Sequence, residues 1–399
     1  MNILIADKLS RNAIVELEQS GFEVRADPAL SAEDLPNELH DTQVLIVRST
    51  KVSAEAIAKA PSLSLIVRAG AGVNTIDLDA ASAAGVFVAN CPGKNADAVA
   101  ELAIGLMIAA DRRIADATSD LRSGAWKKKE YQGARGLKGR TLGILGYGTI
   151  GRAVGRIATS IGMNVLVWSR SMTESRAREA GVTFAPTPQA LASGSDVVSV
   201  HLASTPKTIG LVGREFLSAM SDGSILVNTS RGNIVDQTAL EEAISGKNLR
   251  VALDVWSDEP GGGTADFPAA EFAATVTGTP HIGASTEQAS EAIAAETVRI
   301  VREFARTGVA PNVVNVDEST TTTHVMVVRH FNRVGVLAGV LDALRENDVN
   351  VEEMQNTIFS GGEAACATLR LDSRPSEDAV AAIRQSAAII AVRLEARAN

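Results

Sequence analysis

Short apolar runs alternate with amphipathic segments along the first quarter of the chain. Four runs with the character of buried strands are present, at residues 3–5, 44–47, 65–67 and 86–88. Between them, segments such as 10–20 and 53–60 begin with serine and carry apolar residues at helical spacing. Strands that alternate with helices predict a parallel sheet covered on both faces.

A second series of the same kind follows. Its apolar runs lie at residues 141–145, 165–168, 197–200, 225–228 and 251–254. A long helical pattern at 96–113 leads from the first series to the second, and another at 286–306 leads back. The pattern therefore predicts an α/β protein in which two doubly wound parallel-sheet domains follow one another.

The pattern changes after residue 316. Residues 317–323 are polar and β-branched without a core-forming period, and we interpret them as a linker. The elements beyond are expected in the order strand 325–328, helix 334–346, strand 349–357, strand 364–371, helix 377–385, strand 389–394. This βαββαβ order is typical of a small ferredoxin-like domain.

Composition narrows the classes of function. A chain of 399 residues is too long for one ordinary core, and its net charge of −9 provides no basic surface for nucleic acid. Cys91 and Cys366 lie far apart without metal-ligand spacing, which is typical of the reducing cytoplasm and predicts no metal site. The N-terminus has the pattern of a strand rather than a signal peptide. The apolar stretch 98–110 is interrupted by Glu101 and is too short to span a membrane.

A glycine-rich turn connects a predicted strand to a predicted helix at 152–161. It consists of Gly146, Tyr147, Gly148, Thr149, Ile150 and Gly151. In this context Gly146 makes the turn, Gly148 lets the backbone approach a pyrophosphate, and Gly151 permits close packing of helix on strand. An ordinary glycine-rich turn is the alternative, but the flanking elements favour a dinucleotide site whose phosphates lie at the helix N-terminus.

The second strand of this unit ends without the carboxylate that would bind the ribose hydroxyls of NAD. Ser169 and Arg170 stand there instead, and arginine is suited to binding a 2′-phosphate. We therefore expect NAD(P) as cofactor with a preference for NADP. The alternative is a solvated Arg170 and a ribose held by backbone or water.

Three polar residues lie in loops of the second series. The loops of Arg231 and Glu259 follow predicted strands directly, and that of His281 comes after the short β-prone run 274–277. Loops at the carboxyl ends of strands line the ligand crevice in an open parallel sheet. His281 is suited to proton transfer at a substrate hydroxyl, since histidine titrates near neutral pH. Glu259 would orient the imidazole, and Arg231 would bind a substrate carboxylate and polarise a carbonyl. Each residue alone is more often structural; together, behind a dinucleotide loop, they predict a catalytic set.

In the glycine loop and these three segments the sequence resembles the D-isomer-specific 2-hydroxyacid dehydrogenases, over nearly all of residues 1–316. The resemblance implies hydride transfer between a hydroxy acid and a nicotinamide, with the three residues as catalytic triad. It also implies a split substrate domain, residues 1–94 plus 283–316, and a cofactor domain at 95–282. Asp254 would then hold the nicotinamide amide.

Several further positions are similar to substrate-contacting residues of the phosphoglycerate dehydrogenases within that family. They are Arg48, Ser49, Ala71, Gly72, Val73, Asn74, Asn95, Trp126 and Lys128. The resemblance implies 3-phosphoglycerate as substrate, with Arg48 and Lys128 as cationic donors to its phosphate. Trp126 and Lys128 would reach the site of a neighbouring subunit in a homodimer or homotetramer. A solvated lysine-rich loop at 124–129 is the alternative.

Residues 322–399 resemble an ACT domain. His330, Asn332 and Asn350 are similar to residues that bind serine in such domains, which implies serine as an effector. Val334 departs from the pattern, which has proline there and hence a more rigid turn. A purely dimerising module is the alternative.

Two other functions stay open from the sequence. The Ser169–Arg170 pair is compatible with an NADPH-dependent hydroxypyruvate or glyoxylate reductase. A non-catalytic dinucleotide sensor or corepressor on the same fold is disfavoured by the intact Arg231, Glu259 and His281 set.

Overall fold

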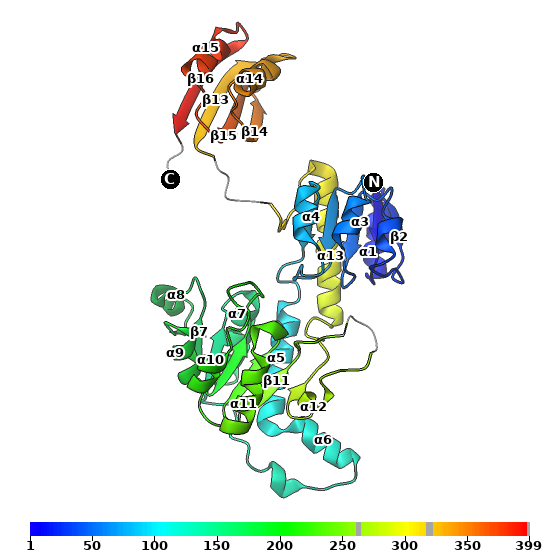
Figure 1. Cartoon of the computed structure of the whole chain (residues 1–399), viewed down its shortest axis with the longest axis vertical. Helices are drawn as coiled ribbons and strands as arrows, with labels where there is room; N and C mark the ends of the chain where they lie inside the picture. The colour runs from blue at the N-terminus through cyan, green and yellow to red at the C-terminus, as the bar shows by residue number, and fades with distance from the viewer. Residues whose placement is uncertain (261–264, 317–321, 397–399) are drawn as a thin grey trace. The chain divides into compact units, whose positions relative to one another are not determined.

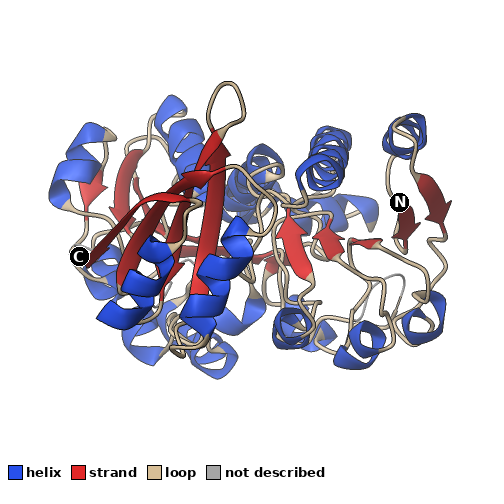
Figure 2. Cartoon of the chain, turned by 90° about the horizontal axis from the view of Figure 1, so that it is seen from above, coloured by secondary structure: helices blue, strands red, loops and turns tan. Residues whose placement is uncertain are grey.

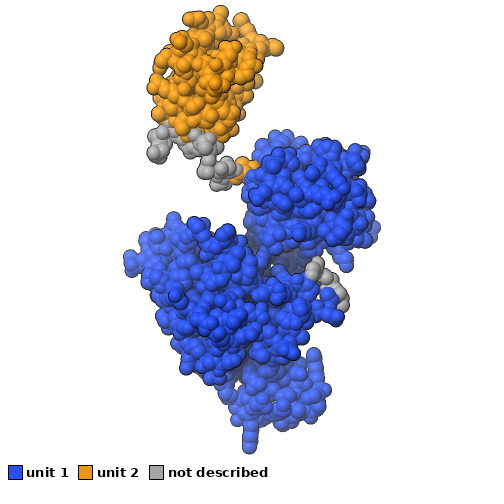
Figure 3. All heavy atoms as spheres, viewed as in Figure 1, with its two compact units in different colours: residues 1–315 blue, residues 316–399 orange. Residues whose placement is uncertain are grey.

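The computed structural model describes residues 1–260, 265–316 and 322–396. The chain forms two compact units, Met1–Asn315 and Val316–Asn399 (Figure 3). Each unit is described by itself below.

The first unit begins with a five-stranded parallel sheet in the order β2-β1-β3-β4-β5. The strands are β1 (Asn2–Ile5), β2 (Glu23–Ala26), β3 (Val44–Val47), β4 (Leu65–Arg68) and β5 (Phe87–Asn90) (Figure 1). All four residues of β3 are buried, because apolar side chains pack on both faces of the sheet. This is a doubly wound order.

A second sheet follows in the same unit, with seven parallel strands in the order β12-β11-β10-β9-β6-β7-β8. The strands are β6 (Thr141–Leu145), β7 (Asn164–Trp168), β8 (Thr183–Phe184), β9 (Val197–Val200), β10 (Ile225–Asn228), β11 (Arg250–Leu253) and β12 (Thr277–Gly278). β6 pairs with β7 on one side and β9 on the other, so the strand order reverses at β6. A ligand crevice is expected beyond the carboxyl ends at this point.

Helices cover both sheets. They are α1 (Arg11–Gln19), α2 (Leu35–Glu38), α3 (Ala54–Ala58), α4 (Leu78–Ala83), α5 (Ala96–Arg112), α6 (Ile114–Arg122), α7 (Thr149–Ser160), α8 (Glu174–Glu179), α9 (Pro188–Ser193), α10 (Arg214–Ala219), α11 (Gln237–Lys247), α12 (Ala270–Ala273) and α13 (Glu287–Thr307). Side-chain caps define several N-termini: Ser10, Ser53 and Thr286 each accept a backbone N–H of the first turn.

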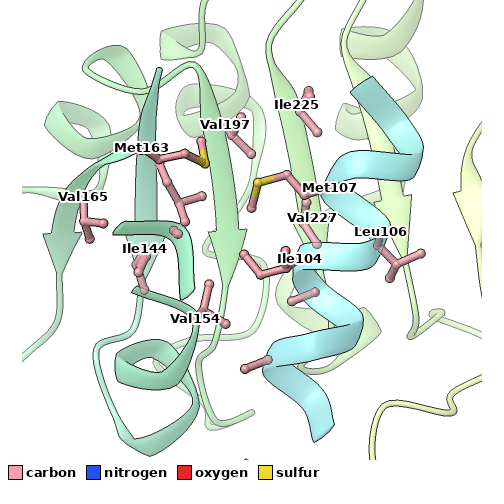
Figure 4. Packing of buried hydrophobic residues seen from close by; sticks show 14 of the residues in the cluster. Ile104, Leu106, Met107, Ile144, Val154, Met163, Val165, Val197, Ile225 and Val227 are labelled. Carbon is pink, nitrogen blue, oxygen red and sulfur yellow. The ribbon is translucent and has the colours of Figure 1, made fainter. Parts of the chain in front are cut away.

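The long helix α5 packs on the second sheet. Its Ile104 and Met107 belong to a buried cluster with Ile144, Val197 and Val227 of three neighbouring strands (Figure 4). Helix α13 packs on the first sheet against β4 and α1, and residue Val313 beyond it bridges to Ala89 of β5. The boundaries expected for a split substrate domain and an inserted cofactor domain stay a prediction.

The second unit is a four-stranded antiparallel sheet with two helices beside it (Figure 2). Its elements are β13 (His324–Phe331), α14 (Val336–Arg345), β14 (Val351–Ile358), β15 (Ala364–Leu371), α15 (Glu377–Gln385) and β16 (Ile389–Ala396), and the strands lie in the order β14-β15-β13-β16 (Figure 1). Apolar side chains of both helices pack on the sheet. The predicted βαββαβ order and the α/β class are confirmed; residues 317–321 of the expected linker lie outside the described residues.

The structure corrects some details of the sequence interpretation. The β-prone run at 274–277 is mostly the turn after α12, and β12 is only Thr277–Gly278. The strands β2 and β8 were not expected, because both are edge strands with few buried residues to mark them. No helix in the part of the chain that the structure describes is long and apolar enough to cross a membrane.

Candidate active site

The three glycines of the turn after β6 occupy three different environments. Gly146 has a φ of +103°, and a Cβ there would lie 2.5 Å from the carbonyl oxygen of His201. A Cβ on Gly151 would lie 2.2 Å from the carbonyl oxygen of Gly146, whereas one on Gly148 would have no atom within 4 Å. The turn is therefore closed toward the protein at the first and third glycines and open at the second, as a pyrophosphate-binding turn requires.

Helix α7 begins directly at this turn. Gly148 is its N-cap and offers no side chain to the first backbone N–H groups, so these donors are left for a ligand. Tyr147 and Ile150 pack against the buried cluster that contains Ile144, and burial raises the pKa of the Tyr147 hydroxyl. Together with Thr149, these residues fit the diphosphate of a dinucleotide: donors, a positive helix end and open space coincide.

The loop after β7 carries Ser169 and Arg170 next to this turn, because Gly146 donates its N–H to the carbonyl oxygen of Trp168 at 2.8 Å. Arg170 is exposed and forms no ion pair among the described residues. A second arginine, Arg176 of α8, donates to the carbonyl oxygen of Ser171 at 2.7 Å. The loop 169–173 thus carries one guanidinium group, binds a second from α8, and contains no carboxylate of its own.

Arg231 lies in the loop after β10. The amide of Asn228 shapes this loop: its Nδ2 donates to the carbonyl oxygen of Arg231 at 2.9 Å, and its Oδ1 accepts both the N–H and the hydroxyl of Ser230. A Cβ on Gly72 would lie 2.2 Å from Nη2 of Arg231, so the loop 71–74 lies against this guanidinium. Burial lowers the pKa of Arg231, although the charge of Glu259 acts the other way.

His281 and Glu259 form the hydrogen bond expected of an oriented histidine. Nδ1 of His281 lies 2.7 Å from Oε2 of Glu259, while Oε1 accepts the N–H of Trp256 at 2.9 Å. Burial alone would raise the pKa of Glu259, but the bonds from His281 and Trp256 outweigh it, so the pKa is lowered and the group stays ionised. The imidazole is 47% exposed, which leaves it accessible to a ligand.

Asp254 holds the segment that carries His281. Its carboxylate is 1% exposed and accepts the hydroxyl of Thr279 at 2.6 Å and the N–H groups of Ile282 and Gly283 at 2.8 Å. His281 itself has a φ of +53° and donates its N–H to the carbonyl oxygen of Asp254. The role of Asp254 in the structure is thus to fix the His281 backbone in an unusual conformation. The expected contact with the nicotinamide amide stays a prediction.

One residue of the site was missed from the sequence. Arg68 is the last residue of β4, is partly buried, and has an Nε with no hydrogen-bond partner among the described residues. Burial lowers its pKa to about 10, and the positive charges of Arg231 and Arg48 add to the effect. Three arginines therefore gather here, and none pairs with a carboxylate in the described part of the chain. The signal was available: Arg68 ends a strand at the same sheet edge as Arg48.

Other expected substrate residues lie at or near this edge. The carbonyl oxygen of Ala71 accepts the side-chain amide of Asn90 at 2.6 Å, and Oδ1 of Asn74 lies near Gly72. Val73 packs on the first sheet. Asn95 is the N-cap of α5, and its buried Oδ1 has no partner among the described residues. The hydroxyl of Ser49, by contrast, donates to Asp7.

Two expected residues lie apart from this group. Trp126 is 80% exposed, and Lys128 starts a short 3-10 helix at Lys128–Tyr131; neither forms a hydrogen bond or ion pair within the described chain. Their preceding helix α6 has no buried residue.

The expected effector residues do not converge in one chain. His330 is buried, with Nε2 3.2 Å from Oδ1 of Asn356, and Asn332 donates to the carbonyl oxygen of Gly362. His330 pairs with Ala365 near one end of β15, whereas Asn350 precedes Val351, which pairs with Leu371 at the other end. A ligand bound by all three would need residues of two chains.

Comparison with known proteins defines the family. The model of the D-isomer specific 2-hydroxyacid dehydrogenase NAD binding domain matches residues 104–283. A hydroxypyruvate reductase of Thermotoga maritima is 39% identical over 284 residues, 69% of this chain and 89% of the relative. A D-3-phosphoglycerate dehydrogenase of Methanocaldococcus jannaschii is 39% identical over 318 residues, 79% of this chain and 60% of the relative. The chain belongs to the family of D-isomer specific 2-hydroxyacid dehydrogenases.

Solved structures agree with this result. A cofactor (NAD+)-bound 3-phosphoglycerate dehydrogenase of Entamoeba histolytica has a TM-score of 0.66 and 30% identity, over 79% of this chain and 99% of that one. An NADPH-dependent glyoxylate/hydroxypyruvate reductase of Sinorhizobium meliloti in complex with NADP has a TM-score of 0.68 and 27% identity, over 78% and 96%. The family and the cofactor class NAD(P) predicted from the sequence are confirmed.

The chain spans between 54% and 63% of the length of the curated D-3-phosphoglycerate dehydrogenases of archaea and mycobacteria that it matches.

Proposed function

We propose that the protein is a D-3-phosphoglycerate dehydrogenase, which transfers a hydride between C2 of 3-phosphoglycerate and NAD(P). One observation carries the proposal: Arg231 lies against Gly72, Arg68 lies against Gly70 and is acted on by the charges of Arg231 and Arg48, and none of the three pairs with a carboxylate of the described residues. Unpaired, partly buried guanidinium groups are costly unless an anionic ligand joins them. A substrate with a carboxylate at one end and a phosphate at the other matches three such cations.

The residues divide the chemistry as follows. Arg231 binds the substrate carboxylate and polarises the C2 oxygen, while Arg48 and Arg68 bind the phosphate. Glu259 holds Nδ1 of His281, so the other ring nitrogen, Nε2, takes the proton of the C2 hydroxyl as the alcohol becomes a ketone. Bound NAD(P)+ would accept the hydride from C2. In the reverse direction His281 returns the proton to the C2 oxygen.

The cofactor is proposed to be NADP in preference to NAD. The loop after β7 supports this, since it contains Arg170, its Ser171 carbonyl oxygen binds Arg176, and residues 169–173 include no acid that would repel a 2′-phosphate.

The active enzyme is proposed to be a cytoplasmic homodimer or homotetramer that starts serine biosynthesis. The exposed Trp126 and the unburied helix α6 support a second chain at this place, which would bring Lys128 to its neighbour's site. The second unit is proposed to be an ACT domain that binds serine between two chains, because His330 and Asn350 lie at opposite ends of one sheet.

A second candidate is an NADPH-dependent hydroxypyruvate reductase. It is favoured by the Thermotoga maritima relative, of which the chain covers 89%, and by the arginines after β7. A non-catalytic sensor is disfavoured, because the hydrogen bond between His281 and Glu259 would have no use in it.

Substrate comparison separates these functions. We expect kcat/KM for 3-phosphoglycerate to exceed that for D-glycerate, and Arg68→Gln to lower the first about ten- to a hundredfold, the value of one charge-assisted bond. The loss for D-glycerate should be much smaller. Arg11→Gln serves as control, because Arg11 is an exposed arginine at the start of α1, beside the first sheet. Faster turnover of hydroxypyruvate than of 3-phosphohydroxypyruvate would favour the reductase instead.

A further inference from the structure

An acidic residue that follows a neighbouring strand binds the loop that carries Arg48. Residues 48–50 follow β3, and Asp7 lies two residues beyond β1. Because β1 and β3 are parallel neighbours, both loops leave the sheet at the same edge. This edge also carries Arg68, the last residue of β4.

Asp7 binds this loop through three successive backbone N–H groups. Its Oδ2 accepts the N–H of Arg48 at 2.7 Å and those of Ser49 and Thr50 at 3.0 Å. Its Oδ1 accepts the hydroxyl of Ser49 at 2.8 Å. Three convergent N–H groups form the kind of turn that binds anions, and the chain fills it with its own carboxylate.

Two consequences follow for the substrate. The backbone donors of the loop are used by Asp7, so a substrate phosphate here depends on the guanidinium side chains. The direct contact expected for Ser49 is also replaced, since its hydroxyl proton and its N–H both go to Asp7.

The charge of Asp7 belongs to the same cluster. Burial would raise the pKa of Asp7, but the bonds from Thr50, Arg48 and Ser49 outweigh it and the pKa is lowered. The carboxylate stays ionised and acts on Arg68, whose pKa it raises against the larger effects of burial and the other arginines. Asp7 itself is absent from the ion pairs of the described chain, so its hydrogen bonds are to the loop and not to a guanidinium.

We propose that Asp7 is a positioning residue of the phosphate half of the substrate site, which fixes the loop 48–50 and with it Arg48. The inference rests on the proposed function and deepens it. Asp27 provides a natural comparison, because it follows the adjacent strand β2 but accepts one loop N–H, that of Ala29 at 3.3 Å. It closes no loop that carries a substrate residue.

Four variants test the inference: Asp7→Ala, Asp7→Asn, Ser49→Ala and the control Asp27→Ala. Asp7→Ala should raise KM for 3-phosphoglycerate about tenfold or more, as expected from misplacing one charge-assisted bond, with kcat and the KM for D-glycerate much less affected. Asp7→Asn keeps an oxygen that can accept the three N–H groups and an NH2 that can donate to Ser49. Most of the rise in KM expected for Asp7→Ala should therefore be absent in Asp7→Asn. Ser49→Ala should give a smaller selective rise in KM.

Binding of NADPH by fluorescence titration and the midpoint of thermal unfolding should be unchanged in Asp27→Ala and nearly so in Asp7→Asn. Equal KM changes for both substrates, or an Asp7→Asn variant as impaired as Asp7→Ala, would overturn the positioning role. If Asp7→Ala unfolds, Asp7→Asn and Ser49→Ala decide alone: a selective rise in Ser49→Ala supports the role and its absence overturns it. A wild-type protein that does not prefer the phosphorylated substrate overturns the proposed function together with this inference.

Discussion

At the residue scale, the imidazole of His281 is fixed from two directions. Glu259 holds Nδ1 of the ring, and Asp254 holds the backbone on both sides of it. A left-handed φ at a non-glycine residue costs free energy that the surrounding bonds must offset. The ring thus presents Nε2 in one orientation, which is what proton transfer at C2 requires.

Glu259→Gln is predicted to lower kcat roughly ten- to a hundredfold, since a neutral amide orients and stabilises the protonated imidazole less well. The pKa of Glu259 is lowered, so its carboxylate is ionised throughout the range above the usual carboxyl pKa and is lost as pH falls through the lowered value. The acid limb of the wild-type rate profile should therefore change in the variant. Cofactor affinity, measured by titration, should stay as in the wild type; a wild-type kcat would contradict the role given to Glu259.

The placement of loops at the carboxyl ends of parallel strands predicted that Arg231, Glu259 and His281 meet, and the resemblance to the family added Arg48. Neither predicted that Arg68 joins them or that Asp7 accepts the hydroxyl of Ser49. Both depend on which side chains fill the space between loops, and spacing along the chain does not encode this.

At the element scale, the contact between the glycine turn and α7 fixes where the helix N-terminus lies. Gly151→Ala would place a Cβ 2.2 Å from the carbonyl oxygen of Gly146, and backbone on both sides resists movement. We predict weaker NADPH binding by about tenfold or more and a loss of about 1–3 kcal/mol in unfolding free energy, as for overpacking. Gly246→Ala on α11, where nothing lies within 4 Å, is the matched control and should be neutral or slightly stabilising. Equal behaviour of the two variants would refute the packing argument.

The loop after β7 is predicted to select the cofactor. A bond from Arg170 to a 2′-phosphate is worth about 1.5–3 kcal/mol, which screening at this exposed position reduces to roughly a tenfold preference for NADP. Added salt should shrink the preference, and Ser169→Asp combined with Arg170→Ala should reverse it. The measurement is kcat/KM with both cofactors, and a wild-type preference for NAD would show that Arg170 is merely solvated.

Elements with strong apolar periods were predicted, and weakly buried ones were not. The fully buried β3 and β9 stood out as continuous apolar runs. The helix α6 has no buried residue in this chain and therefore no apolar stripe facing a core to mark it.

At the scale of the whole molecule, Glu296 connects distant segments of the first unit. This residue of α13 is 7% exposed and binds Arg299 at 2.6 Å, Asn312 at 2.7 Å and Lys94, which precedes the start of α5, at 3.3 Å. The bond from Arg299 is the largest cause that lowers the pKa of Glu296 from 4.5 to about 2.

The sign of the resulting pH dependence follows from that lowered pKa. The ionised carboxylate stabilises the fold above pH 4.5, by on the order of 3 kcal/mol at most, and the contribution is lost as pH falls toward 2. Glu296→Gln should lower the midpoint of thermal unfolding at neutral pH and flatten the loss of stability on acidification. Glu303→Gln, which removes the charge of a partly exposed ion-pair member of the same helix, should change little. An unchanged acid profile in Glu296→Gln would contradict this.

The proposed function is tested most directly by the rate of 3-phosphoglycerate oxidation in the wild type and in His281→Ala, followed as NAD(P)H formation. We expect turnover by the wild type and a fall in kcat of about two to four orders of magnitude in the variant, because the proton acceptor is lost. Cofactor affinity should be the same in both, since the glycine turn is untouched. A His281→Ala variant with wild-type turnover, or a wild type that oxidises no 2-hydroxy acid with either cofactor, would contradict it.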